Sequence, residues 1–136
     1  MSKTIITYGT FDMFHVGHLR LLNRMRDMGD RVIVAVSTDE FNALKGKRAL
    51  IPYDERCDII AALRCVDLVI PEACWEQKIN DIKKYHVDTF VMGGDWSGKF
   101  DYLLSYCRVV YLPRTLDIST SSLKESIRGP HGAFNV

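Results

Sequence analysis

Apolar residues gather in five short runs that recur along the chain. These runs are rich in Val and Ile, which favours strands at about residues 4–8, 31–37, 66–70, 88–92 and 108–112. The segments between them carry apolar residues at helical spacing and predict helices over 16–28, 54–64, 75–86 and 99–106, with a last helix from about Ser121. This alternation, with nearly continuous apolar strands, predicts a parallel sheet with helices on both faces.

The strand count restricts the fold class further. Five strands are too few for an eight-stranded barrel, and right-handed crossovers favour a doubly wound sheet. We therefore expect a single α/β domain with a doubly wound, parallel, five-stranded sheet over residues 1–128, and a C-terminal tail over 129–136. In such folds ligands bind outside the carboxyl ends of the strands, where the strand order reverses.

Composition excludes several classes of protein. The 136 residues are 47% hydrophobic and 26% charged, as in ordinary soluble domains. Eighteen Lys and Arg against 17 Asp and Glu give a net charge of +1, which argues against a nucleic-acid binder. The longest strongly apolar run, Val32–Val36, is too short to cross a membrane, and the N-terminus does not read as a signal peptide. We expect a cytoplasmic protein with reduced thiols at Cys57, Cys65, Cys74 and Cys107.

The first strand–helix junction carries the clearest candidate chemistry. His15 and His18 fall on one face of the first helical turn, beside backbone N–H groups that favour phosphate. Gly9 and Gly17 leave room for a ligand to approach the backbone closely. No Cys or His cluster completes a zinc site, so we predict no metal ligands from the chain.

Gly9–His18 resembles the GTFDxxHxGH signature of the cytidylyltransferase branch of the HxGH nucleotidyltransferases. The resemblance extends over about residues 3–128, with matching stretches at 37–42, 75–78, 91–96 and 111–120. It implies a Rossmann-like nucleotidyltransferase fold, a homodimer, and transfer of a cytidylyl group from CTP to sn-glycerol 3-phosphate. The products would be pyrophosphate and CDP-glycerol, which feeds teichoic-acid-type polymers of the cell wall. Mg²⁺ would be carried mainly by the CTP phosphates.

The resemblance also implies roles for individual residues. A phosphate oxygen attacks without a protein nucleophile, so the site needs donors and cations. The expected catalytic residues are His15, His18, Lys47 and Arg114. These four and Gly9, Thr10, Phe11, Gly17, Asp95, Thr115, Ile118, Ser119, Thr120 and Ser121 would bind the nucleotide. The acceptor would contact Lys45, Arg64, Trp75 and Lys78.

Several alternatives stay open at this point. Arg56 and Arg64 also fit surface arginines, and Trp75 also fits core packing. Leu116 and Asp117 replace the Glu-Gly of the family pattern, and Asp117 adds a negative charge beside the expected triphosphate. Rival functions are nucleotidyl transfer with ATP or another phosphorylated acceptor, and nucleotide binding without turnover in a regulatory module.

Overall fold

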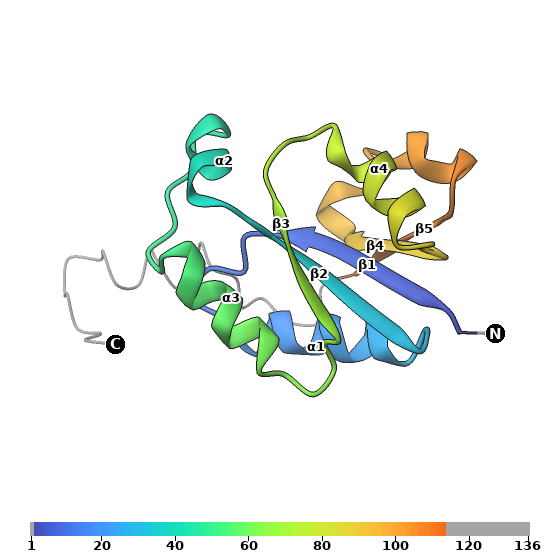
Figure 1. Cartoon of the computed structure of the whole chain (residues 1–136), viewed down its shortest axis with the longest axis horizontal. Helices are drawn as coiled ribbons and strands as arrows, with labels where there is room; N and C mark the ends of the chain where they lie inside the picture. The colour runs from blue at the N-terminus through green and yellow to red at the C-terminus, as the bar shows by residue number, and fades with distance from the viewer. Residues whose placement is uncertain (1, 114–136) are drawn as a thin grey trace.

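The computed structural model describes residues 2–113, which form one five-stranded sheet (Figure 1). All strand pairs are parallel, and the strand order is β3-β2-β1-β4-β5. The strands are β1 (Thr4–Gly9), β2 (Arg31–Ser37), β3 (Leu68–Glu72), β4 (Thr89–Gly93) and β5 (Arg108–Leu112). The predicted parallel five-stranded sheet is confirmed; β3 is displaced toward the C-terminus by two residues and β4 by one.

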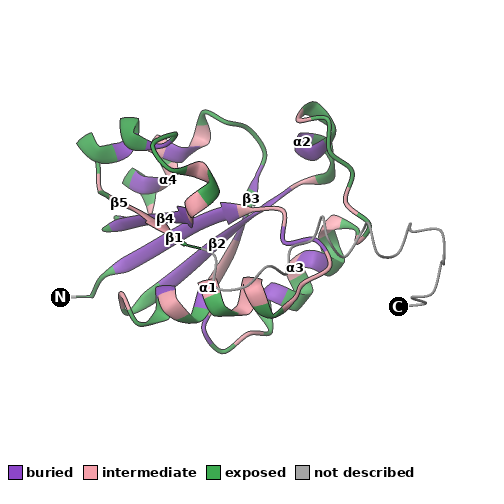
Figure 2. Ribbon diagram, turned by 180° about the vertical axis from the view of Figure 1, so that it is seen from behind, coloured by how far each residue is buried: buried purple, intermediate pink, exposed green. Residues whose placement is uncertain are grey.

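Helices cover both faces of the sheet, as expected for a doubly wound fold (Figures 1 and 2). α1 (Val16–Arg26) and α3 (Tyr53–Ala61) pack on one face, and α4 (Gln77–Lys84) packs on the other. Alternation along each strand divides the core: Ile5 faces the α1 side, whereas the adjacent Ile6 faces the α4 side. Burial is therefore concentrated in the strands, as the purple ribbons of Figure 2 show.

Three helical segments differ from the prediction. Residues 99–106 do not form an α-helix: a 3-10 helix, η2 (Asp101–Ser105), takes their place, since Leu103 alone anchors it in the core. A short helix that was not predicted, α2 (Asp39–Leu44), begins where the Thr38 hydroxyl accepts a hydrogen bond from the backbone N–H of Phe41. A second 3-10 helix, η1 (Gly94–Trp96), follows β4.

The chain reverses its direction of travel across the sheet between β3 and β4. It runs outward from β1 to β2 and β3, then returns to place β4 on the other side of β1. The carboxyl ends of β1 and β4 thus form the point where ligands are expected to bind. The predicted helix from Ser121 and the tail over 129–136 lie outside the described residues.

No helix within residues 2–113 is both long enough and apolar enough to serve as a membrane span.

Candidate active site

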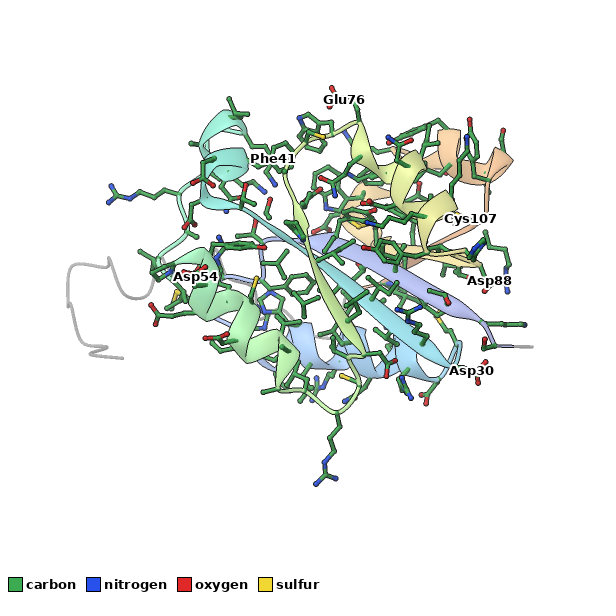
Figure 3. The ribbon with its side chains drawn as sticks, in the orientation of Figure 1. Asp30, Phe41, Asp54, Glu76, Asp88 and Cys107 are labelled. Carbon is green, nitrogen blue, oxygen red and sulfur yellow. The ribbon has the colours of Figure 1, made fainter. Side chains whose placement is uncertain are left out.

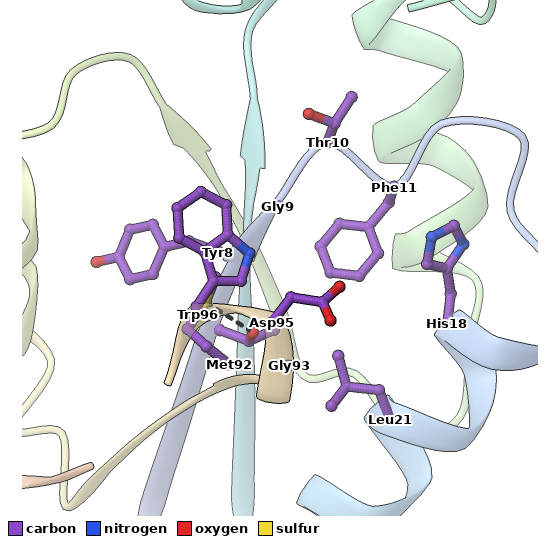
Figure 4. A pocket seen from close by; sticks show the side chains of 11 residues that line it. Tyr8, Gly9, Thr10, Phe11, His18, Leu21, Met92, Gly93, Asp95 and Trp96 are labelled. Atoms are coloured by element: carbon purple, nitrogen blue, oxygen red, sulfur yellow. Dashed lines mark hydrogen bonds between the residues drawn. The ribbon is translucent and has the colours of Figure 1, made fainter. Parts of the chain in front are cut away.

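A cavity of about 240 Å³ opens between the carboxyl ends of β1 and β4 (Figure 4). Its walls come from β1, α1, β4 and η1, and are formed by Thr7, Tyr8, Gly9, Thr10, Phe11, His18, Leu21, Met92, Gly93, Asp95 and Trp96. Five of the residues predicted to bind nucleotide therefore lie together at the expected edge: Gly9, Thr10, Phe11, His18 and Asp95. The carboxylate of Asp95 points into this space from η1 (Figure 4).

Gly9 also has a local structural role. A Cβ atom at Gly9 would lie 2.9 Å from a ring carbon of Phe11, so the glycine makes room for that ring. Phe11 and Met13 have left-handed backbones, with φ of 53° and 49°, which non-glycine residues adopt at a cost. The surrounding contacts must therefore hold the β1–α1 loop in this conformation.

Asp12 supplies part of that restraint. Its side chain is buried, and its two carboxylate oxygens accept hydrogen bonds from the backbone N–H groups of Leu50 (2.8 Å) and Ile51 (2.9 Å). The β1–α1 loop is thus tied to the segment before α3, 38 residues away in the chain. No role for Asp12 was predicted from the sequence. Its position in the Gly9–Asp12 stretch of the family signature was the one signal that could have indicated it.

Arg56 of α3 also restrains the β1–α1 loop. Its guanidinium is almost fully buried and donates to the carbonyl oxygens of Thr10 (2.9 Å), Ser37 (2.7 Å) and Ile51 (2.9 Å). It also forms an ion pair with Asp39 at 2.7 Å. The surface interpretation of Arg56 is therefore wrong: this side chain joins the ends of β1 and β2.

His15 and His18 cap α1 reciprocally. The Nδ1 atom of His15 accepts a hydrogen bond from the backbone N–H of Gly17 (3.0 Å). The Nδ1 atom of His18 accepts one from the backbone N–H of His15 (3.2 Å). An Nδ1 atom that accepts cannot carry a proton, so in each neutral imidazole the proton is on Nε2. The two rings stack with centroids 3.9 Å apart. In this tautomer each Nε2 atom carries a hydrogen that it can donate.

The environment of His18 keeps that ring neutral. Burial, followed by the charge of His15, lowers the pKa of His18 from 6.5 to about 4, although Asp12 opposes the change. The rings of Phe11 and Phe14 lie against His18 with centroid distances of 5.4 and 5.3 Å. His18 is therefore a neutral hydrogen-bond donor near pH 7, suited to phosphate oxygens that gain charge.

Lys45 and Lys47 point in different directions because of the glycine between them. Gly46 has a φ of 72°, and its N–H donates to the carbonyl of Ala43 while that of Lys47 donates to Asn42. This is the Schellman pattern of a helix C-terminus. Lys45 turns inward and is half-buried, whereas Lys47 is exposed. The basic segment Lys45–Arg48 therefore does not form one solvated face.

A second polar cluster lies beside the cavity, at the ends of β2 and β3. Lys78 donates to Oε2 of Glu72 at 3.0 Å, and the Ser37 hydroxyl donates to Oε1 of Glu72 at 3.2 Å. Lys45 donates to the Ser37 hydroxyl at 2.8 Å and lies 4.0 Å from Oε1 of Glu72. We call Ser37, Lys45, Glu72 and Lys78 the lysine cluster. Two of its members were predicted to bind the acceptor, while Ser37 and Glu72 were missed.

Aromatic rings surround the two ammonium groups of the lysine cluster. Nζ of Lys78 lies 4.7 Å from the ring of Tyr8 and 5.2 Å from that of Trp75. Nζ of Lys45 lies 4.5 Å from the ring of Phe41 and 5.7 Å from that of Trp75. Trp75 is 46% exposed, so the core-packing alternative does not describe it. The aromatic faces attract the cations and exclude water from them.

Arg64 is the predicted acceptor residue that the structure leaves elsewhere. It is exposed in the turn between α3 and β3, and therefore lies at the amino edge of the sheet. α3 ends at Ala61, so Arg64 lies beyond the helix that carries Arg56. One chain does not bring Arg64 to the cavity or to the lysine cluster. The remaining predictions, Arg114, Thr115, Ile118, Ser119, Thr120 and Ser121, fall outside the described residues.

Over residues 2–113, no three His, Cys, Asp or Glu side chains are placed so that they could hold a metal ion. The carboxylate of Asp12 is directed to the backbone N–H groups of Leu50 and Ile51, and Asp95 contributes one carboxylate to the wall of the cavity. A magnesium ion would therefore fit this site through the phosphates of a bound nucleotide rather than through a cage of side chains.

The fold and the cavity define an α/β nucleotide-binding protein with two histidine donors at its switch point. A family model described as cytidylyltransferase-like matches residues 6–129, and the chain belongs to this family. It is 55% identical over 127 residues to the glycerol-3-phosphate cytidylyltransferase of Bacillus subtilis (strain 168), a match that covers 93% of this chain and 98% of that protein.

Two further proteins extend these similarities. The glycerol-3-phosphate cytidylyltransferase of Staphylococcus aureus (strain NCTC 8325 / PS 47) is 52% identical over 127 residues, which is 93% of this chain and 96% of that protein. Among solved structures, the lipopolysaccharide core biosynthesis protein from Thermoplasma volcanium GSS1 superposes with a TM-score of 0.73 at 21% identity. That match covers 85% of this chain and all of the other, and it confirms the fold class.

Proposed function

We propose that this protein transfers the cytidylyl group of CTP to sn-glycerol 3-phosphate, giving CDP-glycerol and pyrophosphate. The identity of 55% and 52% to two glycerol-3-phosphate cytidylyltransferases, over almost the full length of each, supports this reaction. The observation that carries it is the position of the lysine cluster beside the histidine cavity. Tyr8 lines the cavity, and its ring also contacts Lys78. The ring of Tyr8 therefore lies between the cavity for the nucleotide and the lysine cluster for the phosphorylated acceptor.

The reaction is an in-line displacement at the α-phosphorus of CTP. A phosphate oxygen of glycerol 3-phosphate forms a bond to this phosphorus while the bond to the bridging oxygen of pyrophosphate breaks, and that oxygen keeps the electron pair. The Nε2–H groups of His15 and His18 donate to the α-phosphoryl oxygens as negative charge builds on them. Donors that strengthen in the transition state contribute on the order of 10²–10³ in rate each.

The cations divide between the two substrates in this proposal. Lys45 meets the acceptor phosphate, and the exposed Lys47 meets CTP. Thr10 and Phe11 offer backbone N–H groups to the nucleotide. Arg114, Thr115 and residues 118–121, which lie outside the described residues, are assigned to the β- and γ-phosphates. Magnesium, bound through the phosphates, would neutralise charge on the leaving pyrophosphate.

The setting of the reaction follows from its substrates. CTP and glycerol 3-phosphate are cytoplasmic metabolites, so the enzyme is placed in the cytoplasm. Its CDP-glycerol supplies teichoic-acid-type polymers of the cell wall, and the working form is a homodimer. Size-exclusion chromatography with light scattering tests the dimer, which a mass near the 15.6 kDa of one chain would contradict.

The function is tested by pyrophosphate release across a panel of nucleotides and phosphorylated acceptors. We expect release only with CTP and glycerol 3-phosphate together, at a rate at least 100-fold above every other pair. A higher rate with ATP, or with another acceptor, would assign the rival transferase function. Binding of CTP with no release for any acceptor would assign the regulatory function instead.

A further inference from the structure

Asn42 is a buried residue to which neither the sequence nor the proposed reaction assigns a role. It lies in α2 and is 1% exposed, and with Phe41 it forms the buried part of this short helix. Its backbone carbonyl accepts hydrogen bonds from the N–H groups of Lys45 (3.0 Å) and Lys47 (2.8 Å). The backbone at Asn42 is therefore satisfied, and the side-chain amide is the part that needs an explanation.

The two ends of this amide are used unequally. Oδ1 accepts a hydrogen bond from the hydroxyl of Thr10 at 3.1 Å, whereas the buried Nδ2 has no hydrogen-bond partner among residues 2–113. Buried donors nearly always have a partner, because a donor removed from water without one costs free energy. A leucine would fill a similar space without that cost. The amide of Asn42 therefore destabilises the free protein, which indicates a role in the presence of a ligand.

Thr10 connects this amide with the nucleotide cavity. It follows β1, lines the cavity, and lies at the upper end of the cavity in Figure 4. Its carbonyl oxygen accepts a hydrogen bond from Arg56 (2.9 Å), which leaves the hydroxyl as the group that can change its partner. A hydroxyl has one hydrogen to donate and two lone pairs that accept. In the free protein that hydrogen is donated to Asn42, so a ligand cannot use it.

We propose that Asn42 is a positioning residue of the nucleotide site, which turns the Thr10 hydroxyl toward a phosphate of the bound nucleotide. A half-turn of the amide about its Cβ–Cγ bond places Nδ2 where Oδ1 was. Nδ2 then donates to Oγ1 of Thr10 and gains its missing partner, and the hydroxyl donates its hydrogen to a phosphate oxygen. Oδ1 takes the former place of Nδ2, where an unpaired carbonyl oxygen is tolerated more readily than an unpaired N–H.

The amide also makes the hydroxyl a better donor, since hydrogen bonds in a chain polarise one another. Asn42 itself does not contact the nucleotide, and acts only through Thr10. The inference rests on the proposed function for the identity of the nucleotide as CTP. If the wild type binds ATP instead, the comparisons below apply to ATP, because the two nucleotides carry the same phosphates.

A set of variants tests this relay. Asn42→Leu keeps a similar volume and removes both polar ends of the amide. Thr10→Val removes the hydroxyl and keeps the backbone N–H, and Thr10→Ser keeps both. Asn80→Leu makes the same replacement at an exposed asparagine of α4 and is the matched control, which should change neither the Kd for CTP nor the thermal midpoint.

The main readout is the Kd for CTP, measured by calorimetry without turnover. Thr10→Val should raise this Kd by about 10-fold, because a charge-assisted hydrogen bond is lost, whereas Thr10→Ser should stay within about threefold. Asn42→Leu should raise it by about fivefold, since the hydroxyl remains but is no longer oriented. The double variant Asn42→Leu/Thr10→Val should bind within about twofold of Thr10→Val alone, because Asn42 acts through the hydroxyl.

Two results in this series would overturn the proposal. One is a Kd for CTP in Asn42→Leu that is equal to or below that of the wild type. The other is a double variant in which the two losses multiply in full, since Asn42 would then act independently of Thr10. A rise in the KM for glycerol 3-phosphate with an unchanged Kd for CTP would also overturn it, because the hydroxyl would then serve the acceptor.

The thermal midpoint separates positioning from a purely structural role. Asn42→Leu removes an unpaired buried donor, so its midpoint should equal that of the wild type or exceed it by up to about 5 °C. If Asn42 only holds α2 against Thr10, the midpoint should fall while the Kd for CTP does not change. That result would contradict the proposal.

NMR on the wild type with ¹⁵N-labelled asparagine does not depend on the folding of any variant. The side-chain N–H signals of the buried Asn42 should shift when CTP is added, and their exchange with water should slow by about 10-fold as Nδ2 gains a partner. Signals that keep their shift and exchange rate at saturating CTP would overturn the proposal. If CTP produces the expected change but no acceptor gives pyrophosphate, the proposed function is wrong and the role of Asn42 stands.

Discussion

The two halves of the carboxyl edge of the sheet offer different groups to a bound phosphate: a neutral donor at β1 and β4, and charged side chains at β2 and β3. At β1 and β4, the cavity presents a neutral donor: the ring of His18, which accepts a hydrogen bond from the backbone N–H of His15 and stacks on the His15 ring. At β2 and β3, on the side of the molecule where Phe41 of α2 lies (Figure 3), the lysine cluster presents full charges that are buried and already paired in part. The first region is built for charge that develops during a reaction, and the second for charge that a ligand brings with it.

This difference follows from what each half must do. A neutral donor gains little from a ground-state phosphate but more from a transition state with added charge, so it favours rate over binding. An ammonium group attracts a phosphate dianion at every stage, so it favours binding over rate. Substitutions in the histidine region should therefore lower kcat, and those in the lysine cluster should raise the KM for the acceptor.

The largest effect is expected at Arg56, which joins the two regions. Arg56→Met removes the donors to the carbonyl oxygens of Thr10, Ser37 and Ile51, all of which are held by one buried guanidinium. We expect a loss of about 3–5 kcal/mol in the free energy of unfolding, because buried acceptors are left without partners. Urea denaturation measures this quantity. A loss below about 1 kcal/mol would show that Arg56 does not couple the strands.

The next largest effect is expected at His18. His18→Ala should lower kcat by 10²-fold or more and leave the Kd for CTP and the thermal midpoint largely unchanged, since its interaction strengthens in the transition state. Steady-state kinetics and calorimetry on the folded variant provide both numbers. A kcat near that of the wild type would remove His18 from the catalytic set and with it the contrast between the two regions.

A smaller effect is expected at Asp117, which lies outside the described residues. Asp117→Gly restores the family pattern at this position and removes a negative charge beside the expected triphosphate. If that charge repels the nucleotide, CTP should bind more tightly by up to ~1–2 kcal/mol. Calorimetry at low salt detects this change, and a Kd equal to that of the wild type would mean that Asp117 lies away from the phosphates.

The strands and helices that position these two regions could mostly be predicted from the sequence. Apolar runs located all five strands, and their alternation with helices predicted the edge where Thr10 and His18 line one cavity. Lys78, far away in the chain, lies beside that cavity against the ring of Tyr8. Periodicity is a local signal, and the parallel arrangement follows from it. It did not separate an α-helix from the 3-10 turns of η2, where a single leucine is buried.

The sequence did not predict which charged side chains are buried and paired with groups from other elements. The predicted strand ended at residue 70, two residues early, so Glu72 fell outside it. In the structure Glu72 is the last residue of β3. Arg56 could be read as a surface residue because its partners are carbonyl oxygens, which no sequence pattern marks. Lys78 was expected as an acceptor residue, but its pairing with Glu72 is visible only once the strands are assembled.

In the proposed reaction His18 is a neutral ring that donates through Nε2. The protonation state of this ring can be measured directly. Because the folded chain binds this proton near pH 4 and an unfolded chain binds it near 6.5, the free energy of unfolding should fall as the pH is lowered through that window. Long-range ¹H–¹⁵N NMR spectra, assigned with His18→Ala, follow the ring itself. We predict the Nε2–H tautomer from pH 8 down to about 5, with a midpoint near 4. A midpoint near 6.5, or a proton on Nδ1, would contradict the account.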